Sequence, residues 1–159
     1  MRWFALRVKS RHEKAVACNL EISNFASFTP LYTARHKWAD RQKTLQLPLF
    51  PGYVFCRFNP SHRASVMRTP GVIDVVKFGD SLAPIDDGEI HALQQLVTSG
   101  CKAEPVPYLA IGQPAAIKSG PLAGLTGTVV EHKNGLRLVL SVALLQRSVL
   151  VEIHRSFLS

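Results

Sequence analysis

Residues capable of acid–base, nucleophilic or metal chemistry are few and widely spaced in this chain of 159 residues. The cysteines, Cys18, Cys56 and Cys101, are odd in number and far apart, so they indicate neither a disulfide framework nor a zinc site and fit a reduced, cytoplasmic compartment. The histidines occur singly, without the short spacing of a metal site. They are His12, His36, His62, His91, His132 and His154. We therefore predict no catalytic residue, no metal and no cofactor.

The other candidates have structural explanations. Asp86, Asp87 and Glu89 stand where a helix is expected to begin, and carboxylates favour that end of a helix. The glycine-containing turn at residues 120–124 lacks the lysine and hydroxyl that a phosphate-binding loop requires. Cys56 lies in an apolar stretch and is expected to be a small core residue. The protein is accordingly predicted not to be an enzyme.

The basic residues carry more information. The net charge is +8, and it is unevenly placed: residues 1–68 hold 12 Lys/Arg and three acidic residues (+9), residues 69–100 carry −4, and residues 101–159 carry +3. Such a distribution favours contact with nucleic acid, although a solvated charged face is the alternative for any single residue. The candidate phosphate-binding residues are Lys9, Arg11, His12, Lys14, Arg41 and Lys43.

Composition excludes two other classes of protein. A hydrophobic fraction of 47% is ordinary for a globular chain and excludes wholesale disorder. No apolar run approaches the roughly 20 residues of a membrane-spanning helix. We therefore expect a monomer that makes no contact with a membrane.

One stretch, residues 47–58, organises the expected fold. Phe50-Pro51-Gly52 is a sharp break, and Tyr53–Phe58 predicts a strand that is apolar on both faces. A central strand covered on both sides would explain this pattern. The alternative is that Phe50, Tyr53 and Phe55 form an exposed aromatic patch that binds a partner.

The elements around this strand predict an α+β domain with an antiparallel sheet over residues 1–100. A capping box, Ser10 with Glu13, is expected to begin a helix that reaches about Asn24. Asn59-Pro60 begins a short helix, and Gly100 ends a third. The expected strands are residues 3–8, 31–38, 44–49, 53–58 and 72–78, with a basic hairpin tip at 39–43.

The C-terminal part predicts a separate small barrel. Residues 101–107 contain two prolines and read as a linker to a domain at 108–159. Short segments punctuated by glycine, including an Asn134-Gly135 hairpin turn, favour strands. Leucines at helical spacing in residues 136–153 leave a helix as the alternative for that tail. The expected strands are 113–118, 125–132, 136–142 and 148–153.

Two motifs in this order resemble the NusG family of transcription elongation factors. Residues 49–55, Leu-Phe-Pro-Gly-Tyr-Val-Phe, are similar to the family's most diagnostic motif, and Trp3-Phe4 resembles its opening aromatic pair. Residues 117–129 are similar to the KOW motif of its C-terminal barrel. The resemblance covers nearly the whole chain and implies a bacterial factor with an N-terminal polymerase-binding domain and an SH3-like KOW barrel.

The resemblance also implies partners. An aromatic depression in the family grips the clamp of the largest RNA polymerase subunit, which suppresses pausing or termination, and basic residues approach the non-template DNA strand. A second polymerase contact would fall on the segment from His62. The implied polymerase-binding residues are Trp3, Phe50, Pro51, Tyr53, Phe55, His62, Arg63 and Ser65. The alternative function is a KOW-type RNA-binding or ribosome-associated protein, which needs basic charge but no aromatic patch.

The barrel loop differs from general NusG proteins. Where these commonly have an aromatic-glycine pair, this chain has Leu144, Leu145, Gln146 and Arg147, so the ring and the glycine's freedom are both absent. The departure resembles specialised paralogues of the RfaH type. We expect an antiterminator in which Leu144, Leu145 and Arg147 contact a small-subunit ribosomal protein and the terminator Rho is not a partner.

Overall fold

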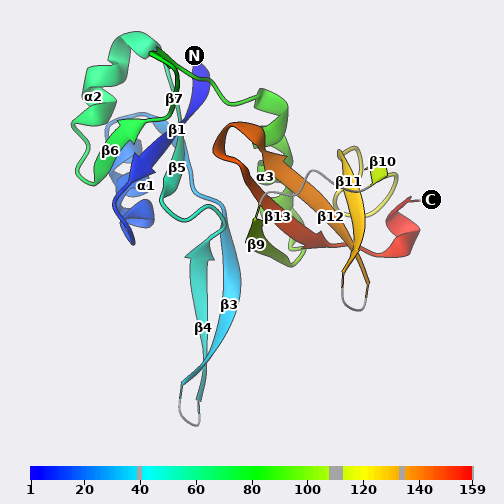
Figure 1. Cartoon of the computed structure of the whole chain (residues 1–159). Helices are drawn as coiled ribbons and strands as arrows, with labels where there is room; N and C mark the ends of the chain where they lie inside the picture. The colour runs from blue at the N-terminus through cyan, green and yellow to red at the C-terminus, as the bar shows by residue number, and fades with distance from the viewer. Residues whose placement is uncertain (39–40, 108–112, 133–134, 159) are drawn as a thin grey trace. The chain divides into compact units, whose positions relative to one another are not determined.

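The computed structural model describes residues 1–38, 41–107, 113–132 and 135–158 (Figure 1). Two compact units divide the chain: Met1–Pro30 with Phe50–Ile90, and Leu31–Leu49 with His91–Ser159. The division therefore falls inside helix α3 (Asp87–Ser99), whereas the predicted domain boundary lay after that helix. Among the described helices, none is long and apolar enough to cross a membrane.

The first unit is built on a four-stranded sheet in the order β2-β5-β1-β6. Its strands are β1 (Arg2–Val8), β2 (Ala26–Phe28), β5 (Tyr53–Phe58) and β6 (Val72–Val75). All of its pairings are antiparallel, and β5 lies between β1 and β2. The prediction that residues 53–58 form a central strand is confirmed, and β2 is an additional strand that sequence patterning did not indicate.

One face of this sheet packs against helix α1 (Glu13–Ile22). The apolar row of the helix is Val16 and Leu20, which are fully buried. These residues form a core with the β1 and β5 side chains that alternate towards the helix; that list is Phe4, Leu6, Val8, Val54, Cys56 and Phe58. The second apolar spacing of the sequence, Ala15, Cys18 and Ile22, is exposed.

The predicted capping box of α1 is wrong. The N-cap residue is His12, and it makes no side-chain capping bond. Arg11 has a φ of 67°, so the chain turns sharply just before the helix, and Ser10 lies outside it. The Glu13 carboxylate, which the capping box requires, instead accepts a hydrogen bond from a distant backbone amide.

Short elements complete this unit. The Asn59 side chain accepts from the Ser61 amide at 3.0 Å, which confirms the predicted helix start and begins η1 (Pro60–His62) and α2 (Arg63–Met67). The strand predicted for residues 72–78 is interrupted at 76, so that β7 (Lys77–Phe78) pairs with β8 (Ser81–Leu82) in a separate ribbon. Gly100, at a φ of 74°, follows α3 as predicted.

Strands β3 (Leu31–Trp38) and β4 (Arg41–Pro48) form a two-stranded antiparallel ribbon (Figure 1). Strand β4 begins earlier than predicted, so Arg41 and Lys43 belong to the strand and not to a loop. The rest of the predicted basic tip, residues 39–40, lies outside the described residues.

The second sheet has five antiparallel strands in the order β10-β11-β12-β13-β9. Its elements are β9 (Ala103–Pro107), β10 (Gln113–Ala116), β11 (Thr126–His132), β12 (Gly135–Val142), β13 (Arg147–Glu152), η2 (Ala143–Leu145) and η3 (Arg155–Leu158). The leucine-rich tail is thus β-structure and not a long helix. The predicted Asn134 turn falls outside the described part of the chain.

The predicted linker at residues 101–107 is corrected by strand β9, which pairs with β13 from Ala103↔Val151 to Pro107↔Arg147. Prolines are tolerated there because β9 is an outer strand of the sheet and needs donors on one side only. The antiparallel sheets, the short helices and the β-rich C-terminal part confirm the predicted α+β class.

Candidate protein and nucleic-acid interface

The aromatic residues around β5 do not form the exposed patch of the second hypothesis. Phe50 and Phe55 are 1% and 0% exposed. Their rings meet edge to face with centroids 5.5 Å apart, and Phe28 stacks on Phe55 at 6.2 Å. Exposure of these two side chains was therefore wrongly predicted. The pattern of β5 reflects cover on both of its faces, as its residues alone indicated.

A smaller surface remains beside the buried rings. Pro51 is exposed, and Tyr53 and Trp3 are partly exposed. Tyr53 lies opposite Arg7 on the neighbouring strand β1. Arg7 Nε donates to Asp74 Oδ1 at 2.9 Å, and this bond and the charge of Asp74 raise the pKa of the Arg7 guanidinium. Tyr53 is thus bordered by an exposed ion pair that sequence patterning did not identify.

The turn that carries Pro51 is fixed by its backbone. Gly52 has a φ of 86°, a conformation that side chains disfavour. Its N–H donates to Glu13 Oε2 at 3.1 Å, and its carbonyl accepts from the Val8 amide at 2.9 Å. The Tyr53 amide donates to the Phe50 carbonyl at 3.1 Å and closes the turn. Its geometry thus depends on β1 and α1, far away in sequence.

The basic residues of the first predicted group lie together between β1 and α1. Lys9, Arg11, His12 and Lys14 are all exposed, and the His12 Nδ1 lies 2.9 Å from the Ser10 carbonyl oxygen. The Lys9 amide donates to the carbonyl of Gly71, which fixes the backbone of this segment. The arrangement can present several positive charges to a polyanion on one short stretch of chain.

The other predicted contact residues lie elsewhere. Lys43 is exposed on β4, and the Arg41 side chain lies outside the described part of the structure. His62 and Ser65 are exposed around η1 and α2, and Arg63 is partly exposed. The His62 ring lies 6.3 Å from the ring of Phe25.

The loop between β12 and β13 differs from its prediction in two respects. Leu145 is 7% exposed, so it is a core residue and not an apolar tip. Gln146 has a φ of 51°, so it adopts the left-handed conformation that a glycine would supply. Leu144 is partly exposed and Arg147 is exposed, and these two remain accessible to a partner.

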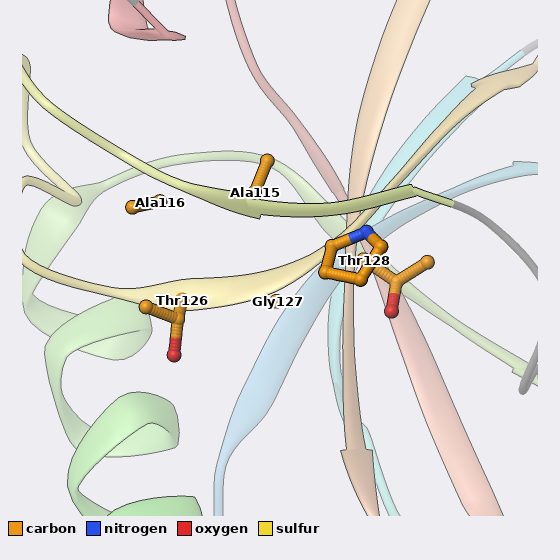
Figure 2. A pocket seen from close by; sticks show the side chains of 6 residues that line it. Ala115, Ala116, Thr126, Gly127 and Thr128 are labelled. Carbon is orange, nitrogen blue, oxygen red and sulfur yellow. The ribbon is translucent and has the colours of Figure 1, made fainter.

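A hollow of about 480 Å³ lies on the β10–β11 pair. Figure 2 shows Thr126 and Thr128 on one side of strand β11 and Ala115 directed to the other. Its lining contains small side chains and two hydroxyls, which gives little chemistry for recognition. Within the described ranges, histidine, cysteine and acidic side chains form no group of three that could hold a metal ion.

Comparison with known proteins agrees with this architecture. The family model described as "NusG: Transcription termination factor nusG" matches residues 1–94. The chain is 26% identical over 151 residues to a transcription termination/antitermination protein NusG of Thermus thermophilus, covering 82% of each. A solved structure titled "Domain interaction in Thermotoga maritima NusG" aligns with 98% of this chain and 94% of that chain, at a TM-score of 0.60 and 21% identity.

Proposed function

The chain belongs to the NusG family of transcription termination and antitermination factors, and from this premise we propose that it binds the clamp of the largest RNA polymerase subunit and suppresses pausing or termination. The description of the family is that of a transcription factor and not of an enzyme. Its match covers the unit that holds β5 and the turn before it.

The observation that carries this proposal is the partly exposed Tyr53 beside the exposed Pro51. An aromatic ring on a rigid strand offers a large contact area at a low cost in side-chain freedom, and such residues dominate many protein interfaces. Phe50 and Phe55 support this surface from below by filling the space under the turn.

The exposed basic segment adds a nucleic-acid contact to this proposal. Lys9, Arg11 and Lys14 would neutralise phosphates of the non-template strand, with His12 beside them. Lys43 offers a further positive charge on β4, and the sequence places Arg41 near it.

For the KOW part we propose a small-subunit ribosomal protein as the partner, which would link transcription to translation. The accessible residues are Leu144 and Arg147, whereas Leu145 acts through packing. Since Gln146 keeps a left-handed backbone, the loop retains the shape that the family's glycine allows.

The decisive experiment is co-purification of the full chain with core RNA polymerase or with ribosomal RNA. Binding to polymerase supports the proposal, and recovery with ribosomal RNA alone favours a KOW-type RNA-binding protein. Tyr53→Ala is expected to weaken polymerase binding by about 2 kcal/mol, as truncated interface aromatics often do. Full binding by a folded Tyr53→Ala protein would contradict the assigned surface.

A further inference from the structure

The acidic residue inside the basic segment 9–14 has an unusual position. Glu13 is 5% exposed, whereas its neighbours Lys9, Arg11 and Lys14 are exposed. A buried carboxylate is tolerated only when hydrogen-bond donors compensate for its lost hydration. Glu13 has such a donor in the Gly52 amide, at 3.1 Å, across 39 residues of sequence.

Gly52 needs this restraint because glycine is the most flexible residue of the chain. No atom lies within 4 Å of the position that a Cβ would occupy on Gly52, so side-chain packing does not hold it. Its restraints are the Glu13 carboxylate on its N–H and the Val8 amide on its carbonyl. The first of these depends on one side chain.

We propose that Glu13 is a positioning residue, which holds the turn at Gly52 in the conformation that presents Pro51 and Tyr53 to RNA polymerase. The inference rests on the proposed polymerase binding. It also explains why an acidic residue stands within the basic segment: its carboxylate points to the turn while the neighbouring cations remain exposed. The segment and the turn are therefore one structural unit, in which the end of β1 and the first turn of α1 hold Gly52 from two sides.

The test uses the full chain with three substitutions at this position. Glu13→Gln keeps a side-chain oxygen that can accept from Gly52, Glu13→Ala removes it, and Glu13→Asp keeps the charge but shortens its reach. Glu21→Ala is the matched control, because Glu21 lies on the same helix and its Oε1 accepts from the Ser27 amide at 2.8 Å, away from the turn. The readouts are affinity for core RNA polymerase and hydrogen exchange at the Gly52 amide.

Glu13→Ala is expected to weaken polymerase binding about tenfold, which corresponds to about 1.4 kcal/mol, and to accelerate Gly52 exchange by a similar factor. Glu13→Gln should stay within about threefold of the unmodified chain, and Glu21→Ala should match it. Tight binding by a folded Glu13→Ala protein with fast Gly52 exchange would overturn the inference. Equal losses in Glu13→Ala and Glu21→Ala would do the same, since they would reflect general destabilisation.

Two further outcomes are separable. If Glu13→Ala does not fold, weaker binding by Glu13→Asp than by Glu13→Gln supports positioning, and the reverse order overturns it. If the unmodified chain fails to bind polymerase, the proposed function fails, and Gly52 exchange measured without polymerase decides on Glu13 alone. Acceleration in Glu13→Ala then supports its hold on the turn, and unchanged exchange refutes it.

Discussion

Replacing Phe55 by alanine separates a core role from a contact role for the aromatic residues around β5. Phe55 is 0% exposed and its ring contacts those of Phe50 and Phe28. Truncation of a buried phenylalanine costs about 3–5 kcal/mol, and loss of two ring contacts places Phe55→Ala in the upper part of that range. Tyr53→Ala, at a partly exposed position, should cost about 1 kcal/mol.

Urea denaturation measures this difference. A loss of about 4 kcal/mol at an m-value of about 2 kcal/mol/M lowers the unfolding midpoint by about 2 M. Phe55→Leu, which keeps most of the apolar volume, should lose less than about 1.5 kcal/mol. The reasoning is refuted if Phe55→Ala leaves the midpoint in place and abolishes polymerase binding, since Phe55 would then be a contact residue.

Three other predictions follow from separate parts of the chain. Reversal of Lys9, Arg11 and Lys14 to glutamate should weaken binding of single-stranded or bubble DNA and flatten its dependence on salt; an unchanged slope would leave them as solubilising charges. Burial raises the pKa of the Cys56 thiol to about 12, so Cys56 should resist alkylation at pH 8 while Cys18 reacts. Because an unfolded thiol ionises near pH 8.5, this residue's contribution to stability should fall between about pH 9 and 12, which pH-dependent unfolding would detect. In a termination assay the purified protein should not enhance Rho-dependent release; enhancement would place it with general NusG proteins.

Local patterns predicted most elements because they depend on neighbouring residues. The alternation in Tyr53–Phe58 and the Asn59-Pro60 helix start are confirmed with their expected bounds. The same residues also indicated that β5 is covered on both faces. The family resemblance shifted that interpretation towards an exposed patch, and the burial of Phe50 and Phe55 corrects it.

Long-range contacts account for the errors. Ser10 and Glu13 have the spacing of a capping box, but Gly52 competes for the carboxylate from 39 residues away, which no local pattern can indicate. Gln146 adopts a conformation usually reserved for glycine, because the turn between β12 and β13 imposes it. The basic segment was predicted correctly as a group of exposed cations; its connection to the turn required the structure.

The prolines of the second sheet have a consequence for solubility. Pro105 and Pro107 lie in β9, and Pro114 lies in β10; these are the two outer strands of the sheet. An outer strand with a free row of amide groups can recruit a strand from another molecule, which begins aggregation. Each proline removes one such donor, so neither edge offers an uninterrupted template. Replacing them with β-branched residues would leave the fold's pairings possible and make the protein prone to self-association at high concentration.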